Sequence, residues 1–194
     1  MFWFILQLFE IHYVKKYKYS KITKLIEFKF KSTPVFEGSI FLSKYSLCEI
    51  MSLKPVKFDD YKVSDSAKFT KTITEEDIMK FAEVSGDYNP LHVNPEYAKT
   101  QMFGKQVAHG VISVGLISAS LGVHLFGPGI LYGEQSVRFV KPVFIGDELT
   151  AVATVKEKFT KKDGKLKFIR CDTKVYNQSE EIVTDGEAVV LLLN

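Results

Sequence analysis

An aspartate and a histidine stand five positions apart, on either side of an Asn-Pro turn, in the segment 85–92, Ser-Gly-Asp-Tyr-Asn-Pro-Leu-His. A carboxylate and an imidazole can share general acid-base chemistry, because one can take a proton while the other gives or positions one. Pro90 fixes its own φ and pushes Asn89 away from helical geometry, so the turn restricts both side chains. The pattern predicts that Asp87 and His92 converge on one water molecule.

Each of the two side chains also has an ordinary structural explanation. Aspartate favours loop positions, so Asp87 could simply cap the turn. His92 could be a surface histidine or a core histidine whose hydrogen bonds are satisfied. The spacing alone does not choose between these alternatives and catalysis, so the surrounding sequence has to decide.

A helix predicted over 74–86 delivers the aspartate into the turn. Thr74 can cap this helix, and Asp77 follows three residues later in the manner of a capping box. Apolar residues at i, i+3 and i+4 give the helix one buried face. Gly86 can adopt a positive φ, so the helix should end there, immediately before Asp87.

Two more helices are predicted after the turn. The first is short, with Asn94 as its cap, Pro95 at its first position and Tyr97 directed inward. The second covers 110–125 and has no charged residue from 111 to 123. A helix that is apolar on every side should be buried, and this one is too short to span a membrane.

Small residues share one face of this apolar helix. Gly115, Ser118 and Gly122 are spaced by three and four positions, which would let another element approach closely. His124 stands at the far end of the helix and is interpreted as structural. The Gly-Pro-Gly run at 127–129 should terminate the helix.

The remainder of the domain has the composition of antiparallel strands. An Asp-Gly turn at 162–165 and a polar turn at 177–180 predict hairpins. Pro142 cannot donate to a strand ladder, so it should lie at an edge or a bulge. One apolar helix among such strands predicts an α+β fold, with an antiparallel sheet wrapped around the helix. The predicted strands are 66–73, 130–142, 148–160, 166–176 and 182–193.

Composition divides the chain into an N-terminal extension, 1–54, and a single domain, 55–194. The extension holds nine lysines and four glutamates, whereas acidic residues slightly outnumber basic ones in the domain. The net charge of +3 therefore originates in the extension. Because the domain has no basic excess, nucleic-acid binding has little electrostatic support.

The extension opens on an apolar run that is too short to cross a bilayer, lacks the order of a secretory signal, and contains no arginine. Three alternatives remain: Met51 is the true start, the extension is a targeting segment, or it forms an amphipathic element. Cys48 and Cys171 make no CxxC or Cys/His cluster, so neither a disulfide framework nor a zinc site is indicated. We expect a cytoplasmic protein, or a mitochondrial-matrix protein if the extension is a presequence.

The run 84–92, with Ala98 six residues later, resembles the signature of the MaoC-like, R-specific enoyl-CoA hydratases. Val-Ala-His-Gly at 107–110 and Phe-Val-Lys-Pro-Val-Phe-Ile-Gly-Asp at 139–147 follow in the order of that family. The resemblance covers about 58–193. It implies a hot-dog fold, one unit per chain, and a homodimer.

The activity implied by this resemblance is reversible hydration of a trans-2-enoyl-CoA to an (R)-3-hydroxyacyl-CoA, a hydro-lyase reaction of fatty-acid metabolism. Asp87 is the implied principal base, and His92 is its partner in orienting water and passing the proton. Gly110 is the implied oxyanion donor, because it opens the apolar helix where backbone N–H groups are free.

Three further residues are given supporting roles. Ser118 matches a position that supports the catalytic aspartate by hydrogen bonding, although a small residue at a close contact explains it almost as well. His109 is expected to pack and fix the entrance of the helix, and Asn89 to hold the loop in shape. Lys105, Lys141 and Arg138 are candidates to meet CoA phosphates. No metal is expected, and no cofactor beyond the CoA or carrier-protein thioester.

Other activities remain open at this stage. The first is a 3-hydroxyacyl-[acyl-carrier-protein] dehydratase of fatty-acid synthesis, with the same chemistry on another handle. The second is a non-catalytic acyl-thioester binding protein, and retention of both Asp87 and His92 argues against it. The third is a thioesterase, whose sequences lack this Asp-x-Asn-Pro-Leu-His layout. Acyl-chain preference does not follow from the sequence.

Overall fold

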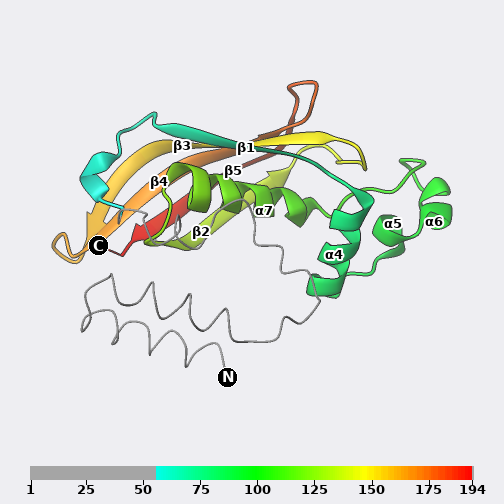
Figure 1. The fold of residues 1–194 in the computed structure, drawn as a ribbon, viewed down its shortest axis with the longest axis horizontal. Coiled ribbons are helices and arrows are strands. Elements are labelled where there is room, and N and C mark those ends of the chain that lie inside the picture. The colour runs from blue at the N-terminus through cyan, green and yellow to red at the C-terminus, as the bar shows by residue number, and fades with distance from the viewer. Residues whose placement is uncertain (1–55, 194) are drawn as a thin grey trace, which may run out of the picture. The chain divides into compact units, whose positions relative to one another are not determined.

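An antiparallel sheet curves around one central helix in the computed structural model, which describes residues 56–193 (Figure 1). The five strands lie in the order β1-β3-β4-β5-β2, so β1 and β2 form the two edges. Three further helices, α4, α5 and α6, gather beyond one end of the sheet. The strands are β1 (Ser66–Thr72), β2 (Ile130–Phe139), β3 (Glu148–Lys161), β4 (Leu166–Tyr176) and β5 (Ile182–Leu192).

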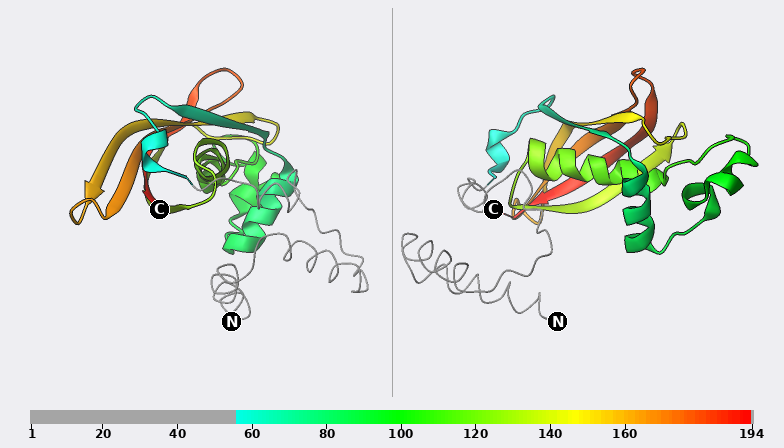
Figure 2. Two further views of the ribbon diagram at one scale, coloured as in Figure 1. Left: turned by 60° about the vertical axis from the view of Figure 1, so that its left-hand side comes forward. Right: turned by 45° about the vertical axis from the view of Figure 1, so that its right-hand side comes forward.

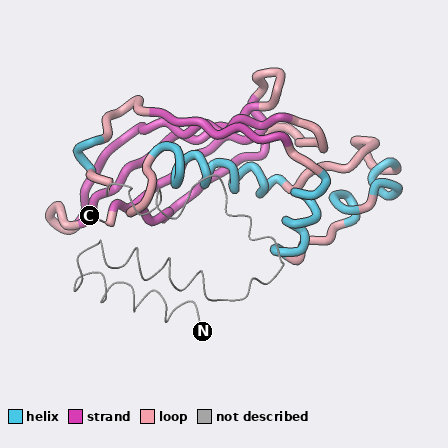
Figure 3. The backbone as a smooth tube through the Cα atoms, viewed as in Figure 1, coloured by secondary structure: helices cyan, strands magenta, loops and turns pink. Residues whose placement is uncertain are grey.

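Alternation along the strands builds the core. In β4, Ile169, Cys171, Thr173 and Val175 are fully buried, while the residues between them are only partly covered. This period of two places one face of the sheet against the helix α7 (Gly110–Ala119), as the views in Figures 2 and 3 show. The predicted α+β arrangement of a sheet around a helix is therefore confirmed.

The helix α4 (Glu75–Ser85) begins and ends where the sequence predicts. The Thr74 hydroxyl accepts a hydrogen bond from the Asp77 N–H, and the Asp77 carboxylate accepts one from the Thr74 N–H, which completes the capping box. Gly86 has φ 78° and donates its N–H to the Ala82 carbonyl at 2.8 Å. The glycine thereby turns the chain toward Asp87.

Two short helices follow. α6 (Pro95–Lys99) has Asn94 as its cap and a proline at its first position, as predicted. The expected inward direction of Tyr97 is wrong: Tyr97 is 44% exposed, and Ala98 beside it is fully buried instead. α5 (Pro90–Val93) was not predicted, because a single turn of helix carries too little periodicity to be recognised in sequence.

The apolar helix occupies the predicted range and packs into the core, but only one side of it is buried, not every side as predicted. α7 continues into a π-helical stretch, η2 (Ser120–Leu125), and the two together cover 110–125. Leu116 and Ile117 pack into the core, whereas Val111, Gly115 and Ser118 are exposed on the opposite side. An added Cβ at Gly115 or at Gly122 would meet nothing within 4 Å. Within one chain, the small-residue face therefore contacts no other described element closely.

Both predicted hairpins are present, and the positions around them refine the strand limits. In the 162–165 turn, Lys162, Asp163 and Gly164 all have positive φ. In the 177–180 turn, the Asn177 side chain accepts from the Ser179 N–H at 3.0 Å. The strand β2 ends at Phe139, so Pro142 lies in the following loop rather than at an edge or a bulge.

Within the described part of the chain, no helix has the length and apolarity that a membrane crossing requires. The three alternatives for the extension, among them a start at Met51, concern residues outside 56–193. Cys48 lies outside that range as well. Cys171 is a free, fully buried thiol in β4, and burial raises its pKa to about 12. That thiol therefore stays protonated and unreactive in the folded protein.

Candidate active site

One carboxylate and two imidazoles converge beside the start of α7. Asp87, His92 and His109 each bring one side-chain oxygen or nitrogen to within 4.8 Å of the others. The two imidazole rings lie 4.0 Å apart between centroids at an interplanar angle of 33°. The predicted convergence of Asp87 and His92 is therefore present, with a second histidine beside them.

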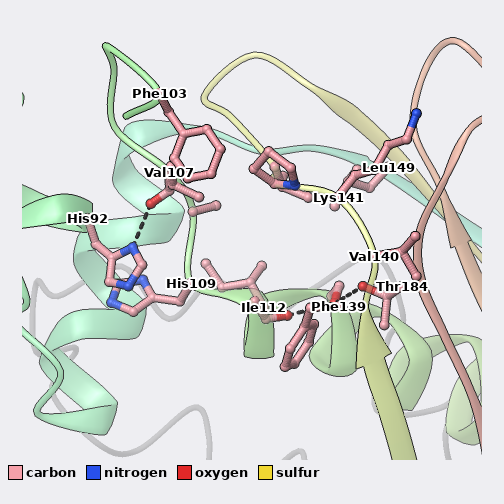
Figure 4. Close-up of a pocket in the computed structure, with 15 residues that line it drawn as sticks. His92, Phe103, Val107, His109, Ile112, Phe139, Val140, Lys141, Leu149 and Thr184 are labelled. Carbon is pink, nitrogen blue, oxygen red and sulfur yellow. Dashed lines mark hydrogen bonds between the residues drawn. The ribbon is translucent and has the colours of Figure 1, made fainter. Parts of the chain in front are cut away.

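The hydrogen bond that His92 makes fixes its tautomer. Its Nδ1 lies 2.6 Å from the Val107 carbonyl oxygen, which can only accept, so Nδ1 carries the hydrogen and donates it (Figure 4). A neutral imidazole that donates from Nδ1 keeps a lone pair on Nε2. His92 can therefore accept a proton or a water hydrogen at Nε2. The residue is half-buried and lines the pocket described below.

His109 is held more rigidly than His92. It is 3% exposed, and its Nε2 donates to the Asp87 backbone carbonyl at 2.9 Å. The same nitrogen lies 3.9 Å from the Asp87 carboxylate, and Phe81 packs on the ring at 4.8 Å. Its Nδ1 is buried without a hydrogen-bond partner among the described residues. These contacts agree with the expected packing role and tie the 85–92 turn to α7.

The loop that carries Asp87 is shaped by short side-chain-to-backbone hydrogen bonds. Asp87 Oδ1 accepts from the Asn89 N–H at 3.2 Å, and Asn89 Oδ1 accepts from the Leu91 N–H at 3.1 Å. Asn89 thus caps α5 and holds the turn, as the sequence predicts. The Asp87 side chain is 52% exposed, so its second oxygen faces solvent near His109.

A pocket of about 390 Å³ opens next to the histidines. Both imidazoles and the first turn of α7 line one side, and the segment 139–143 lines the other (Figure 4). Most of its wall is apolar, so it suits a hydrocarbon chain better than a charged ligand. The lining residues include His92, Phe103, His109, Gly110, Ser113 and Thr184.

Gly110 lies at the mouth of this pocket, as the first residue of α7. Its N–H has no hydrogen-bond acceptor among the described residues, as expected for the first turn of a helix. A Cβ at this position would come within 3.1 Å of the Phe139 ring. A larger residue would therefore have to displace the Phe139 ring slightly, and the free N–H of Gly110 points to a site for negative charge.

A buried pair of hydroxyls in the pocket wall was missed by the sequence analysis. Ser113 Oγ donates to the Gly110 carbonyl at 2.6 Å, and it lies 2.8 Å from Thr184 Oγ1. Both side chains are almost fully buried. The two positions are 71 residues apart, so no local spacing signals the pair. It fixes the first turn of α7 to β5.

Several other candidate residues lie away from this cluster. Ser118 is exposed on the outward side of α7, and no hydrogen bond joins it to Asp87 among the described residues. His124 stacks on Phe69 at 5.2 Å at the far end of the helix, which agrees with a structural role. Arg138 and Lys141 pair with carboxylates.

The Asp-His-His set is also one that transition metals can use. The His92 Nδ1 and His109 Nε2 atoms already donate to backbone carbonyls. A metal could therefore use only the His92 Nε2 atom, the His109 Nδ1 atom and the carboxylate. That the reaction needs no metal ion stays a prediction.

The sequence of this chain is similar to those of several known proteins. A sequence model of the MaoC like domain matches residues 61–177, which is more than half of the chain. An (R)-specific enoyl-CoA hydratase of Rhodospirillum rubrum is 44% identical over 135 residues, covering 70% of this chain and 90% of that protein. A mitochondrial 3-hydroxyacyl-[acyl-carrier-protein] dehydratase of Arabidopsis thaliana is 38% identical, covering 69% of this chain and 78% of that protein.

Among solved structures, the unliganded R-hydratase PhaJ1 from Pseudomonas aeruginosa superposes with a TM-score of 0.66. The two sequences are 39% identical, and the match covers 71% of this chain and 86% of that one. The family match over residues 61–177 includes the segment that carries the histidines.

Proposed function

The chain belongs to the MaoC-like domain family and has its hot-dog fold, and on that premise we propose that it is an (R)-specific enoyl-CoA hydratase. It adds water reversibly across the double bond of a trans-2-enoyl-CoA to give an (R)-3-hydroxyacyl-CoA. The observation that carries the proposal is the convergence of Asp87 and His92 beside an apolar pocket. An acid-base pair beside an apolar cavity suits an enoyl thioester.

Asp87 and His92 hold and activate the water. The oxygen of the water adds to C3, and one of its hydrogens passes to the base as the bond forms. C2 then takes up a proton, so the two steps together consume one water molecule. Asp87 acts as the principal base, and the lone pair on His92 Nε2 orients the water and carries the proton onward.

The Gly110 N–H stabilises the enolate that forms during the addition. Negative charge develops on the thioester oxygen, and the first turn of α7 offers an unpaired N–H with the positive end of the helix dipole behind it. Removing such a donor typically costs about 3 kcal/mol of transition-state stabilisation. The Ser113–Thr184 pair keeps this turn in place.

A carrier-protein dehydratase is the second candidate, and the Arabidopsis thaliana relative favours it. The chemistry at Asp87 and His92 would be unchanged, and only the thioester handle would differ. Matched crotonyl-CoA and crotonyl-carrier-protein substrates separate the two by their values of kcat/KM. The Arabidopsis relative, whose name includes "mitochondrial", keeps the matrix as the alternative to the cytoplasm.

A homodimer is part of the proposal. The outward face of α7, with Val111, Gly115 and Ser118, is apolar or small and uncovered in one chain. Among residues 56–193, the edge strand β2 pairs with β5 alone, and its other side is open. Joining two copies would cover both features. Light scattering on the purified protein tests this, and Gly115→Glu should shift a dimer to monomer.

The decisive experiment is the loss of ultraviolet absorbance by crotonyl-CoA, with chiral analysis of the product. The expected product is the R enantiomer, and neither added metal nor any other cofactor should be needed. An S product, or release of free CoA thiol without hydration, contradicts the assignment. The variants Asp87→Asn and His92→Gln should abolish the absorbance change while leaving the circular dichroism spectrum unaltered.

A further inference from the structure

The sequence offers three cations as candidates to meet CoA phosphates, and two of them, Arg138 and Lys141, are engaged by carboxylates. The Arg138 guanidinium lies 2.6 Å from the Asp185 carboxylate. The Lys141 ammonium lies 2.5 Å from Glu181. Lys105 has no carboxylate partner among the described residues, so its charge is the one available for an anionic ligand.

An aromatic support holds Lys105 in place. Its Nζ sits 3.8 Å from the centroid of the Phe144 ring, a cation–π contact. Phe144 packs edge-on against Phe103 at 6.2 Å, and Phe103 lines the pocket. The exposed Lys105 side chain is therefore linked to the wall of the pocket through two aromatic rings.

Backbone contacts fix the two loops that carry these residues. Val107 forms an isolated antiparallel bridge with Phe144, and the Ala108 N–H donates to the Val143 carbonyl at 2.7 Å. The Lys105 side is thus joined to the loop after β2. Met102 and Ile145 lie on the same two loops and are exposed, 89% and 40% respectively. These two loops therefore combine a lysine that has no carboxylate partner among the described residues with exposed apolar side chains.

We propose that Lys105 binds a phosphate of the thioester handle. The inference rests on the hydratase function proposed above and assigns a residue to recognition of the handle. Coenzyme A and the prosthetic arm of a carrier protein both carry phosphopantetheine, so the shared chemistry is a phosphate at the end of an apolar and amide-bearing arm. An ammonium over a ring keeps its donors free for phosphate oxygens.

Lys105→Gln tests the proposal with three substrates: crotonyl-CoA, crotonyl-4′-phosphopantetheine and crotonyl-pantetheine. The variant should raise KM for crotonyl-CoA about fivefold, with kcat unchanged, as an exposed charge pair worth about 1 kcal/mol predicts. KM for crotonyl-pantetheine, which has no phosphate, should not change. A rise for crotonyl-4′-phosphopantetheine locates the contact at the phosphate shared with carrier proteins, and its absence locates it on the nucleotide end of CoA.

A matched control is Lys161→Gln. Lys161 also lies over aromatic rings, Phe159 and Phe168, but at the β3–β4 hairpin, which Figure 1 shows at the opposite end of the sheet. This variant should leave every KM unchanged, and Lys105→Arg should retain most of the CoA affinity. Higher salt should weaken CoA binding by the wild type more than by Lys105→Gln.

Calorimetric titration with CoA itself separates this inference from the proposed function. A fivefold weaker Kd in Lys105→Gln supports the phosphate contact even if no enoyl thioester is hydrated. An unchanged Kd and KM for CoA overturns it. An equal loss with crotonyl-pantetheine also overturns it, because the effect would then come from the shape of the pocket.

Discussion

The turn at 85–92 and the strand β4 are built in opposite ways. Every residue from 83 to 90 is exposed, and the turn is shaped by short side-chain-to-backbone hydrogen bonds. In β4, every second residue from Ile169 to Val175 is fully buried, and both edges of the strand are paired. The turn provides the candidate catalytic side chains but buries little surface. The strand contributes to the stability of the fold and provides no candidate catalytic side chain. The two functions should therefore respond to mutation separately.

Asp87→Asn should give the largest separation between an effect on activity and an effect on stability. We expect kcat for crotonyl-CoA to fall about 1,000-fold, because general acid-base groups contribute on that order. Stability should hardly change, since the side chain is half exposed and asparagine can still accept from the Asn89 N–H. Steady-state kinetics and thermal melting measure the two. A variant that kept a tenth of the activity would remove Asp87 from the mechanism.

Ile169→Ala should produce the reverse result. The side chain is fully buried in β4, and truncating such a residue typically costs about 3 kcal/mol of unfolding free energy. Activity per folded molecule at 25 °C should stay near that of the wild type. Urea titration with an assay of the folded fraction measures both. Leu193→Ala, at a 61% exposed position, is the control and should cost under about 0.5 kcal/mol.

Gly110→Ala changes a residue that belongs to neither the turn nor β4, at the start of α7. The new methyl group would come within 3.1 Å of the Phe139 ring, which lines the pocket and would have to shift. We expect kcat/KM to fall about tenfold through displaced substrate. The double variant Gly110→Ala with Phe139→Leu should recover part of the loss. If the second substitution makes the loss worse, crowding is not the cause.

Thr74→Ala should have the smallest effect, about 1 kcal/mol of unfolding free energy, through loss of the cap of α4. Burial tends to raise the pKa of Asp77, but hydrogen bonds from Thr74 and the nearby Lys71 ammonium outweigh it and hold that pKa below its usual range. The stabilisation is therefore complete above the unfolded pKa of about 4 and is lost as pH falls through the folded value.

Urea titrations at pH 7 and pH 3 measure this effect. The difference in stability between wild type and Thr74→Ala should be smaller at pH 3 than at pH 7, because the lower pH favours the protonated carboxyl of Asp77. A difference that stays constant with pH would mean that the carboxylate contributes nothing through the cap. Glu83→Ala, near the exposed end of the same helix, serves as the control.

Local signals predicted the elements well, and the reason is visible in α4. A cap, a third-position acid and a terminal glycine act within one turn of chain, so Thr74, Asp77 and Gly86 specify the helix ends without tertiary contacts. The convergence of Asp87 and His92 also follows from a local turn. These parts of the fold and site could be read from the residues alone.

Features that depend on distant partners could not be predicted. Tyr97 and Ala98 are neighbours, and only the packing of the surrounding helices decides which one turns inward. The Ser113–Thr184 pair joins α7 to β5 across 71 positions. The outward side of α7 is as apolar as its inward side, so composition gave no sign that Val111 would be exposed.

The hairpin between β3 and β4 offers a practical use. Its tip, with Lys162, Asp163 and Gly164 in left-handed backbone conformations, stands at the end of the sheet opposite α5 (Figure 1). Solvent-exposed turns of this kind tolerate inserted sequence. A peptide tag placed there would anchor the enzyme to a solid support with its pocket facing the medium, so that substrate could reach an immobilised catalyst freely.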